Sequence, residues 1–146
     1  MSVTFRYFVP DDLALLAPQP EQADWLTAAP GGAEPMDPEA LFVAGPAWTA
    51  IDGLSVLCCA GFGQVSQTHA IAWAIVSADI GAGMVAVTRY AREQIDASRY
   101  LRIEAIVRAG FAPGVRWARM IGLDEVHTLR NWGTPPEDHL LFERIR

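Results

Sequence analysis

The sequence predicts an α/β protein in which strands and helices alternate, and residues 70–95 carry most of that prediction. Residues 70–80 form a nearly unbroken apolar run, which is typical of a strand buried on both faces. Beyond this run the apolar residues fall three and four positions apart, as on one face of an amphipathic helix: Met84, Val87, Ala91 and Ile95. Gly81 and Gly83 separate the two patterns, so a strand, a tight turn and a helix are predicted in succession.

Two further observations extend this prediction to a sheet. Asp52-Gly53 lies between two apolar runs, and such a pair favours a type I′ hairpin because it tolerates the positive φ that both central residues need. The pair predicts antiparallel strands at 47–51 and 54–62, which the strand at 70–78 continues as a meander. Residues 101–107 alternate between apolar and more polar side chains, and this pattern predicts a further strand.

The remaining elements follow from shorter patterns. Residues 3–9 alternate as a strand, and Asp11 or Asp12 is expected to cap a short helix behind it. A second short helix is expected over 20–28, followed by a loop rich in proline and glycine at 30–39 and by a helical turn. The later patterns predict a helix and two closing strands, at 113–121, 126–131 and 139–145.

Charge is distributed unevenly along the 146 residues, whose formal net charge is −6. Residues 1–88 carry one arginine against nine acids, whereas residues 89–146 carry ten arginines against eight acids, and there is no lysine. The acidic balance excludes a general nucleic-acid binder, which needs a basic stripe for phosphates. The arginine-rich second half can still meet a small anionic ligand.

Length and hydropathy bound the class of protein. The chain fits one domain, residues 1–146, and no apolar run reaches the roughly 18–20 residues that a membrane-spanning helix needs. The first residues lack the layout of a signal peptide, so we expect a location in the cytoplasm or in a particle assembled inside a cell. Adjacent Cys58 and Cys59 lie in an apolar strand, which favours small buried residues over a disulfide, a metal site or a nucleophile.

The glycine turn at 81–83 is the first candidate for function. A strand, a glycine turn and a helix N-terminus leave backbone N–H groups unpaired at the positive end of the helix dipole. Phosphates are the usual ligands of such an arrangement. The alternative is that Gly81 and Gly83 only make a tight turn, and the residues by themselves leave both interpretations open.

Five short stretches, in their order along the chain, carry a family resemblance: Trp48–Gly53 with Ala60 and Gly61, Ala72–Ile75, Leu101–Val107, Arg116–Leu123, and Glu137–Phe142. This order resembles the GNAT superfamily of N-acetyltransferases over nearly the whole chain. The chain looks most like the small GNAT-like proteins of tailed bacteriophages. The resemblance implies a mixed, mostly antiparallel, twisted sheet of about six to seven strands with helices on both faces.

The resemblance also implies a reaction, the direct transfer of an acetyl group from acetyl-CoA to an amine. In the family, the pyrophosphate lies on a loop with the pattern Q/R-x-x-G-x-G/A, and Gly81-Ala82-Gly83 fits its second half, whereas Ala78 occupies the Q/R position. The cofactor-binding residues that the resemblance implies are Ile75, Val76, Ser77, Ile80, Gly81, Ala82, Gly83, Met84 and Trp117.

Catalytic residues are harder to assign. Many family members carry a tyrosine, which protonates the leaving thiolate, at the position of Ala118, so a nearby tyrosine, Tyr100 or Tyr90, or solvent must supply that proton here. Of the two, Tyr90 lies on the helix and is better explained by packing. Glu104 is the best-placed carboxylate for a general base, and the alternative is that it forms an ion pair with Arg102 or Arg108. His69 and His127 are better explained as hydrated or hydrogen-bonded side chains, and no metal-ligand spacing occurs.

Two functions therefore follow from the resemblance. The first is an acyl-CoA-dependent N-acetyltransferase of phage or prophage origin, acting in the bacterial cytoplasm on an amine acceptor. The second is a non-catalytic GNAT-like phage protein that acts in virion assembly or host interaction through protein contacts, with a protein partner or as a homodimer. Ala118 and Ala78 favour the second function, whereas the glycine turn and the arginine-rich second half favour the first.

Overall fold

The computed structural model describes residues 2–26 and 36–146. Seven strands form one sheet in the order β1-β2-β3-β4-β5-β7-β6. The strands are β1 Val3–Tyr7, β2 Ala47–Asp52, β3 Ser55–Gln64, β4 His69–Val76, β5 Arg102–Arg108, β6 Asp124–Trp132 and β7 Glu137–Ile145. The helices are the 3₁₀ helix η1 Pro10–Leu15, α1 Pro20–Leu26, α2 Pro38–Ala44, α3 Gly83–Ala97 and α4 Ala112–Met120.

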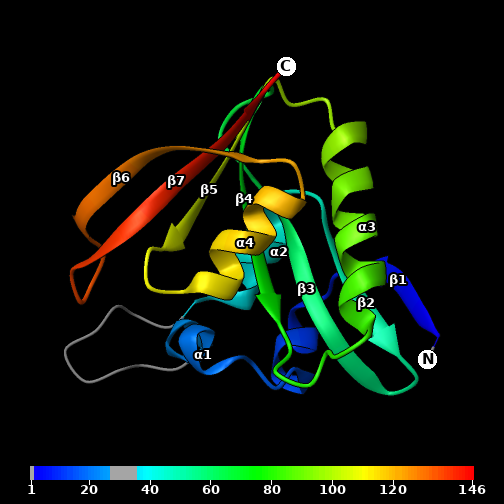
Figure 1. Ribbon diagram of the computed structural model, residues 1–146. Helices are drawn as coiled ribbons and strands as arrows, with labels where there is room; N and C mark the ends of the chain where they lie inside the picture. The colour runs from blue at the N-terminus through cyan, green and yellow to red at the C-terminus, as the bar shows by residue number, and fades with distance from the viewer. Residues whose placement is uncertain (1, 27–35) are drawn as a thin grey trace.

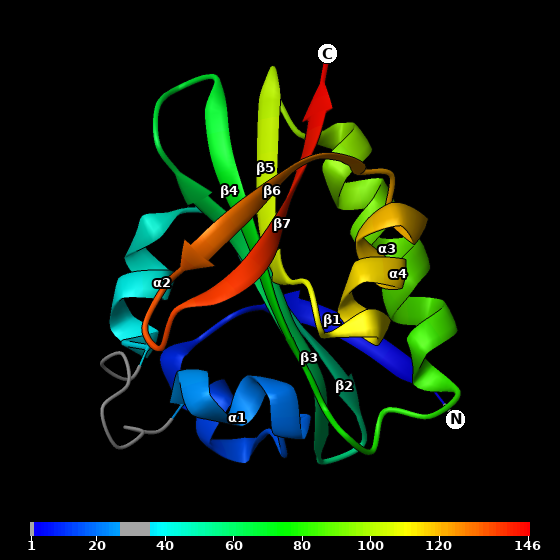
Figure 2. The same ribbon diagram turned by 60° about the vertical axis from the view of Figure 1, so that its left-hand side comes forward.

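The predicted fold class is confirmed. All neighbouring strands are antiparallel except β4 and β5, so the sheet is mixed and mostly antiparallel. Helices cover both faces: α3 and α4 lie on one side of the sheet, and α1 and α2 lie on the other (Figure 2). The predicted helix at 20–28 is α1 as far as Leu26, and its last two residues, with most of the predicted loop at 30–39, lie outside the described residues.

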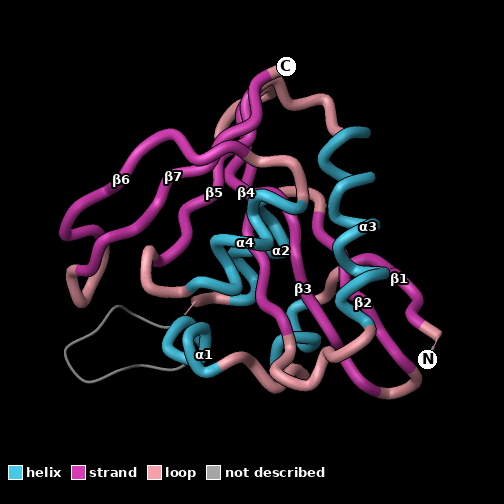
Figure 3. Tube along the Cα trace, viewed as in Figure 1, coloured by secondary structure: helices cyan, strands magenta, loops and turns pink. Residues whose placement is uncertain are grey.

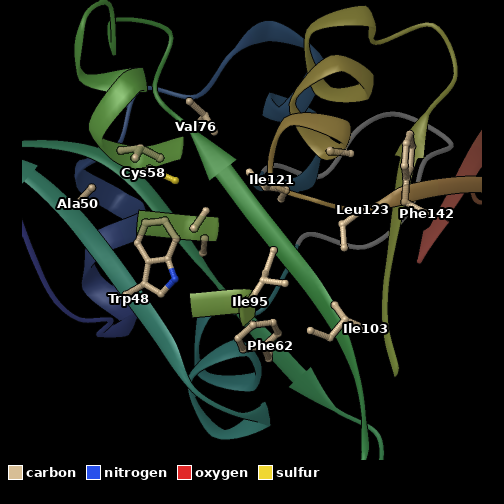
Figure 4. Close-up of a cluster of buried hydrophobic side chains, with 14 of the residues drawn as sticks. Trp48, Ala50, Cys58, Phe62, Val76, Ile95, Ile103, Ile121, Leu123 and Phe142 are labelled. Carbon is tan, nitrogen blue, oxygen red and sulfur yellow. The ribbon is translucent and has the colours of Figure 1, made fainter. Parts of the chain in front are cut away.

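Each face of the sheet has its own apolar core. The larger core joins the sheet to α3 and α4, and Figure 4 shows Val76, Ile95, Ile103 and Phe142 among its side chains. The smaller one joins the sheet to η1. Cys58 and Cys59 are fully buried as expected, and burial raises the pKa of the Cys59 thiol to about 12.

The hairpin between β2 and β3 differs from its prediction by one residue. Asp52 pairs with Ser55, so the two central residues of the turn are Gly53 and Leu54, not Asp52 and Gly53. Only Gly53, the first of them, has a positive φ, of 60°. Glycine at the first central position is the signature of a type II′ turn, so the predicted type I′ turn is wrong.

Asp12 also lies elsewhere than predicted, because Val9 and not Asp12 is the N-cap of η1. The Asp12 carboxylate is buried, and it accepts hydrogen bonds from the Val9 N–H at 3.0 Å and from the Thr49 hydroxyl at 2.7 Å. The Arg6 guanidinium donates to both carboxylate oxygens, at 2.6 and 2.7 Å. One carboxylate thus ties β1, η1 and β2 together.

The parallel pair of β4 and β5 positions the rest of the molecule. The two strands pair only from His69–Ile71 to Arg102–Glu104, at their first residues. Beyond that point they separate, as Figure 1 shows. The end of β4 leads through a short loop into α3 (Figure 3). Among the described residues, no helix combines the length and the apolar character that a membrane crossing requires.

Candidate functional site

The separation of β4 from β5 opens a cavity of about 860 Å³. Its walls come from β4, β5, the loop before α3, α4, and the turn between β6 and β7. Residues from both faces of the sheet line it, such as Ala118 of α4 on one face and Gln22 of α1 on the other. Its size and its largely apolar walls, with few polar groups, are typical of a small-molecule site.

Gln22 covers the part of the β4 edge that is not paired with β5. Its carboxamide oxygen accepts from the Val76 N–H at 2.9 Å, and its amide nitrogen donates to the Ala74 carbonyl at 2.9 Å. The side chain therefore pairs with β4 as a neighbouring strand would. A second contact is made by the Gln19 N–H, which donates to the Val76 carbonyl at 3.3 Å. This edge is where an extended ligand with amide groups can add to the sheet.

The glycine turn offers fewer donors than the sequence predicts. The N–H groups of Ile80, Gly83 and Met84 already donate to the carbonyls of Ser77, Ile80 and Gly81, at 3.0–3.3 Å. Gly81 has a φ of 51°, a left-handed conformation that glycine adopts without strain. For the N–H groups of Gly81 and Ala82, the described part of the chain contains no acceptor. An anion at this turn would therefore meet two free donors.

The predicted cofactor-binding residues divide into three groups. Those that line the cavity are Val76, Ile80, Gly81, Met84 and Trp117. Ala82 and Gly83 lie in the turn beside them. Ile75 is buried in the smaller core and Ser77 is buried with its Oγ accepting from the Asp79 N–H, so these two side chains lie outside the cavity lining.

Trp117 links the two helices that border the cavity. Its indole N–H donates to the Thr88 hydroxyl at 2.9 Å, and that hydroxyl donates to the Met84 carbonyl at 2.7 Å. The chain of bonds fixes the indole of α4 against the first two turns of α3. Ala118, next to it, is buried in the cavity wall, so no acidic side chain stands at this position.

Glu104 and Tyr100, the predicted catalytic residues, are outside the cavity lining. The Arg102 Nε and the His69 Nε2 each lie 2.7 Å from Oε1 of Glu104. The hydrogen bond from Arg102 lowers the pKa of Glu104, outweighing partial burial, which acts to raise it. The ion pair with Arg102, weighed as the alternative, is present. Tyr100 is buried and donates to Gln64 at 2.9 Å. Both catalytic roles stay predictions.

The wide end of the separation is closed by Arg108, the last residue of β5. Its guanidinium donates to the Glu21 carbonyl of α1 at 2.9 Å, and its Nε lies 3.1 Å from the Glu137 carboxylate of β7. Arg108 thus ties α1 to the start of β7 and pairs with Glu137, not with Glu104. Within the ranges that the structure describes, no three His, Cys, Asp or Glu side chains are grouped as metal ligands.

Gln22 and His139 are hydrogen-bonding residues of the cavity that the sequence did not single out. A glutamine in a short helix gives no local signal, because its partners on β4 lie more than fifty positions away along the chain. His139 is buried with its Nδ1 2.9 Å from the Glu137 carbonyl. Its only signal in the sequence is a histidine directly before the apolar run Leu140-Leu141-Phe142.

No protein-family model matches the sequence, and no curated protein does. Solved structures do match. An N-acetyltransferase from Staphylococcus aureus Mu50 superposes with a TM-score of 0.72 at 20% identity, over 99% of this chain and 99% of that chain. A ribosomal-protein-alanine N-acetyltransferase from Brucella melitensis gives a TM-score of 0.67 at 20% identity, over 98% of this chain and 99% of that one.

A third structure is a candidate acetyltransferase from Salmonella typhimurium with its cofactor acetyl-CoA. It gives a TM-score of 0.68 at 15% identity, and the match covers 98% of this chain and 93% of that chain. Identities this low establish an architecture and not an activity. The chain therefore has the fold of the GNAT acetyltransferases.

Proposed function

We propose that this protein transfers an acetyl group from acetyl-CoA directly to an amine. The observation that carries the proposal is the position of the glycine turn, in which Gly81 lines the cavity between β4 and β5 and the N–H groups of Gly81 and Ala82 have no acceptor in the described part of the chain. A ligand with a phosphate at one end and an extended amide chain behind it fits this combination. The Salmonella structure with acetyl-CoA supports the choice of that ligand.

Each wall of the cavity has a role in this proposal. Gly81 and Ala82 would hold the pyrophosphate, and the apolar side chains of Ile80, Met84 and Trp117 would cover the chain that follows it. The edge of β4 at Ala74 and Val76 would pair with the amides. Acetyl-CoA would then enter from the side of α3 and α4, and the amine from the side of α1.

The leaving thiolate lacks an acidic neighbour at the position of Ala118. A positioned acid contributes about 10²–10⁴-fold to a rate, so transfer is expected to be slow and the thiolate to take its proton from solvent. A second function, a GNAT-like phage protein that acts through protein contacts without catalysis, is favoured by this alanine and by the pairing of Gln22 with β4. The proposed phage or prophage origin and cytoplasmic location rest on the sequence alone.

Calorimetric titration of the purified protein with acetyl-CoA and with CoA tests the proposal. We expect one molecule of either to bind, followed by turnover with a panel of polyamines and peptide amines. If millimolar acetyl-CoA produces neither heat nor a shift of the melting temperature, the acetyltransferase proposal is wrong. Binding without turnover would leave the non-catalytic function.

Gln22→Ala is expected to raise the affinity for acetyl-CoA. Gln22 occupies the Ala74 carbonyl and the Val76 N–H, so a ligand amide has to displace two hydrogen bonds before it can pair with β4. A protein hydrogen bond contributes about 0.5–1.5 kcal/mol net, which predicts a gain of about fivefold or more in the association constant.

Gln19→Ala is the matched control, because Gln19 contacts β4 through its backbone N–H and also lines the cavity. Its affinity for acetyl-CoA, measured by the same titration, should match that of the wild type. A lower affinity of Gln22→Ala would instead show that Gln22 helps to hold the ligand.

A further inference from the structure

We propose that His139 is the general base of the transfer and accepts the proton of the acceptor amine at Nε2; the inference rests on the proposed acetyltransferase function. His139 is the one imidazole among the described residues that line the cavity.

The hydrogen bonding of the ring fixes which nitrogen is free. Nδ1 of His139 lies 2.9 Å from the carbonyl oxygen of Glu137. A carbonyl can only accept, so Nδ1 carries the hydrogen and the lone pair of the neutral ring is on Nε2. The described residues provide no partner for Nε2. The imidazole is therefore held in the tautomer that a general base requires.

The register of the sheet places His139 on the side from which an amine would enter. His139 is opposite Arg108 of β5, at the wide end of the separation. The next residues inward, Leu140 and Phe142, contact the larger core under α3 and α4, and side chains alternate along a strand, so His139 faces the side of α1. Gly133 of the β6–β7 turn lies close to the ring, since a Cβ on this glycine would be 3.9 Å from Cε1 of His139.

The other possible bases in the cavity wall are engaged or exposed. Glu137 is paired with Arg108 at 3.1 Å, and Glu21 lies on the exposed surface of α1. The charged residues that line the cavity together with His139 are Arg108 from β5, Glu137 from its own strand, Glu21 from α1 and Arg116 from α4, and Asp138 precedes it on β7. Asp138 accepts from the Asn131 N–H at 3.3 Å. None of the carboxylates among them contacts the imidazole in the described structure.

In the step that we assign to His139, the amine nitrogen attacks the thioester carbonyl carbon of acetyl-CoA. A carbon–nitrogen bond forms, and the N–H proton passes to Nε2. The carbon–sulfur bond breaks, its electron pair leaves on the sulfur, and the CoA thiolate takes a proton from water. The imidazolium then returns its proton to solvent, so the enzyme is restored.

His139→Gln tests the inference, with His127→Gln as the matched control on the exposed surface of β6. Rates of acetyl-CoA turnover are measured from pH 5 to 9, by thiol release, with the amine panel and with water as acceptor. We expect kcat of His139→Gln to be about 10²–10⁴-fold lower than that of the wild type. We also expect the fall of kcat at low pH to disappear from its pH–rate profile, while the Kd for CoA, measured by calorimetry, is unchanged. His127→Gln should match the wild type throughout.

Rescue separates a chemical role from a structural one. In His139→Ala, added imidazole should restore part of the rate, because it can enter the space that the side chain leaves. If His139→Gln kept both the kcat of the wild type and its fall in kcat at low pH, the inference would be overturned. It would also be overturned if Glu104→Gln lost that fall in kcat at low pH and His139→Gln did not. Failure of the wild type to bind acetyl-CoA would instead overturn the proposed function itself, and binding without any turnover would overturn both.

Discussion

Asp12→Asn is expected to destabilise the protein by about 2–3 kcal/mol at neutral pH, which is a large part of the stability of a domain of this size. The substitution keeps the shape of the side chain and removes the negative charge to which Arg6, Val9 and Thr49 all donate hydrogen bonds. Breaking a fully buried pair costs more, about 3–5 kcal/mol, but the Arg6 side chain is 43% exposed and keeps part of its hydration. Urea denaturation of the two proteins measures the difference.

The pH dependence of this difference follows from the pKa of Asp12. Burial acts to raise it, but the hydrogen bonds from Arg6, Val9 and Thr49 outweigh burial, so the pKa lies below its ordinary value of 3.8. A carboxyl whose pKa is lowered by folding stabilises the fold above its unfolded-state pKa and loses that contribution as the pH falls through the folded-state value.

The stability difference between wild type and Asp12→Asn should therefore be constant from neutral pH down to about 4 and shrink below it. Asp11→Asn removes the same charge from the neighbouring exposed residue, and we expect it to change stability by no more than about 0.5 kcal/mol. Equal effects of the two substitutions would show that the buried ion pair does not stabilise the fold.

The fold was largely predictable from the sequence because its signals are local. The helix predicted at 84–97 is α3, and the strand predicted at 70–78 is β4, each within two residues of its observed bounds. The 3.6-residue spacing that predicted the helix and the unbroken apolar run that predicted the strand are both local features of the sequence, and they need no knowledge of the neighbouring elements. The predicted hairpin turn was wrong by one residue because a glycine such as Gly53 can occupy either central position of a two-residue turn.

The sequence predicted only those parts of the candidate site whose residues are neighbours along the chain. The glycine turn could be predicted from Gly81 and Gly83. The sequence did not predict that the N–H groups of Gly83 and Met84 donate to carbonyls within the turn. The pairing of Gln22 with β4 and the place of His139 in the cavity depend on how distant strands separate. Glu104 lies on β5 as predicted, but it forms an ion pair with Arg102 and is outside the cavity lining.

Ala82→Asp is expected to weaken acetyl-CoA binding by about 100-fold without destabilising the protein. Ala82 is exposed, is the N-cap of α3 and forms no side-chain capping bond. Aspartate is a favoured N-cap, so the melting temperature should stay the same or rise. The same carboxylate would stand beside the Gly81 and Ala82 N–H groups, where repulsion of a pyrophosphate amounts to about 1–4 kcal/mol.

Ala82→Asn is the control of the same shape, and its affinity for acetyl-CoA should stay within about threefold of the wild type, since an amide adds no charge. Raising the salt concentration should recover part of the affinity of Ala82→Asp, because exposed charges are screened over roughly 10 Å at 0.1 M. Pantetheine, which carries no phosphate, should bind wild type and Ala82→Asp equally. If Ala82→Asp bound acetyl-CoA as tightly as the wild type does, the pyrophosphate would have to lie elsewhere, and the turn at 81–83 would only connect β4 to α3.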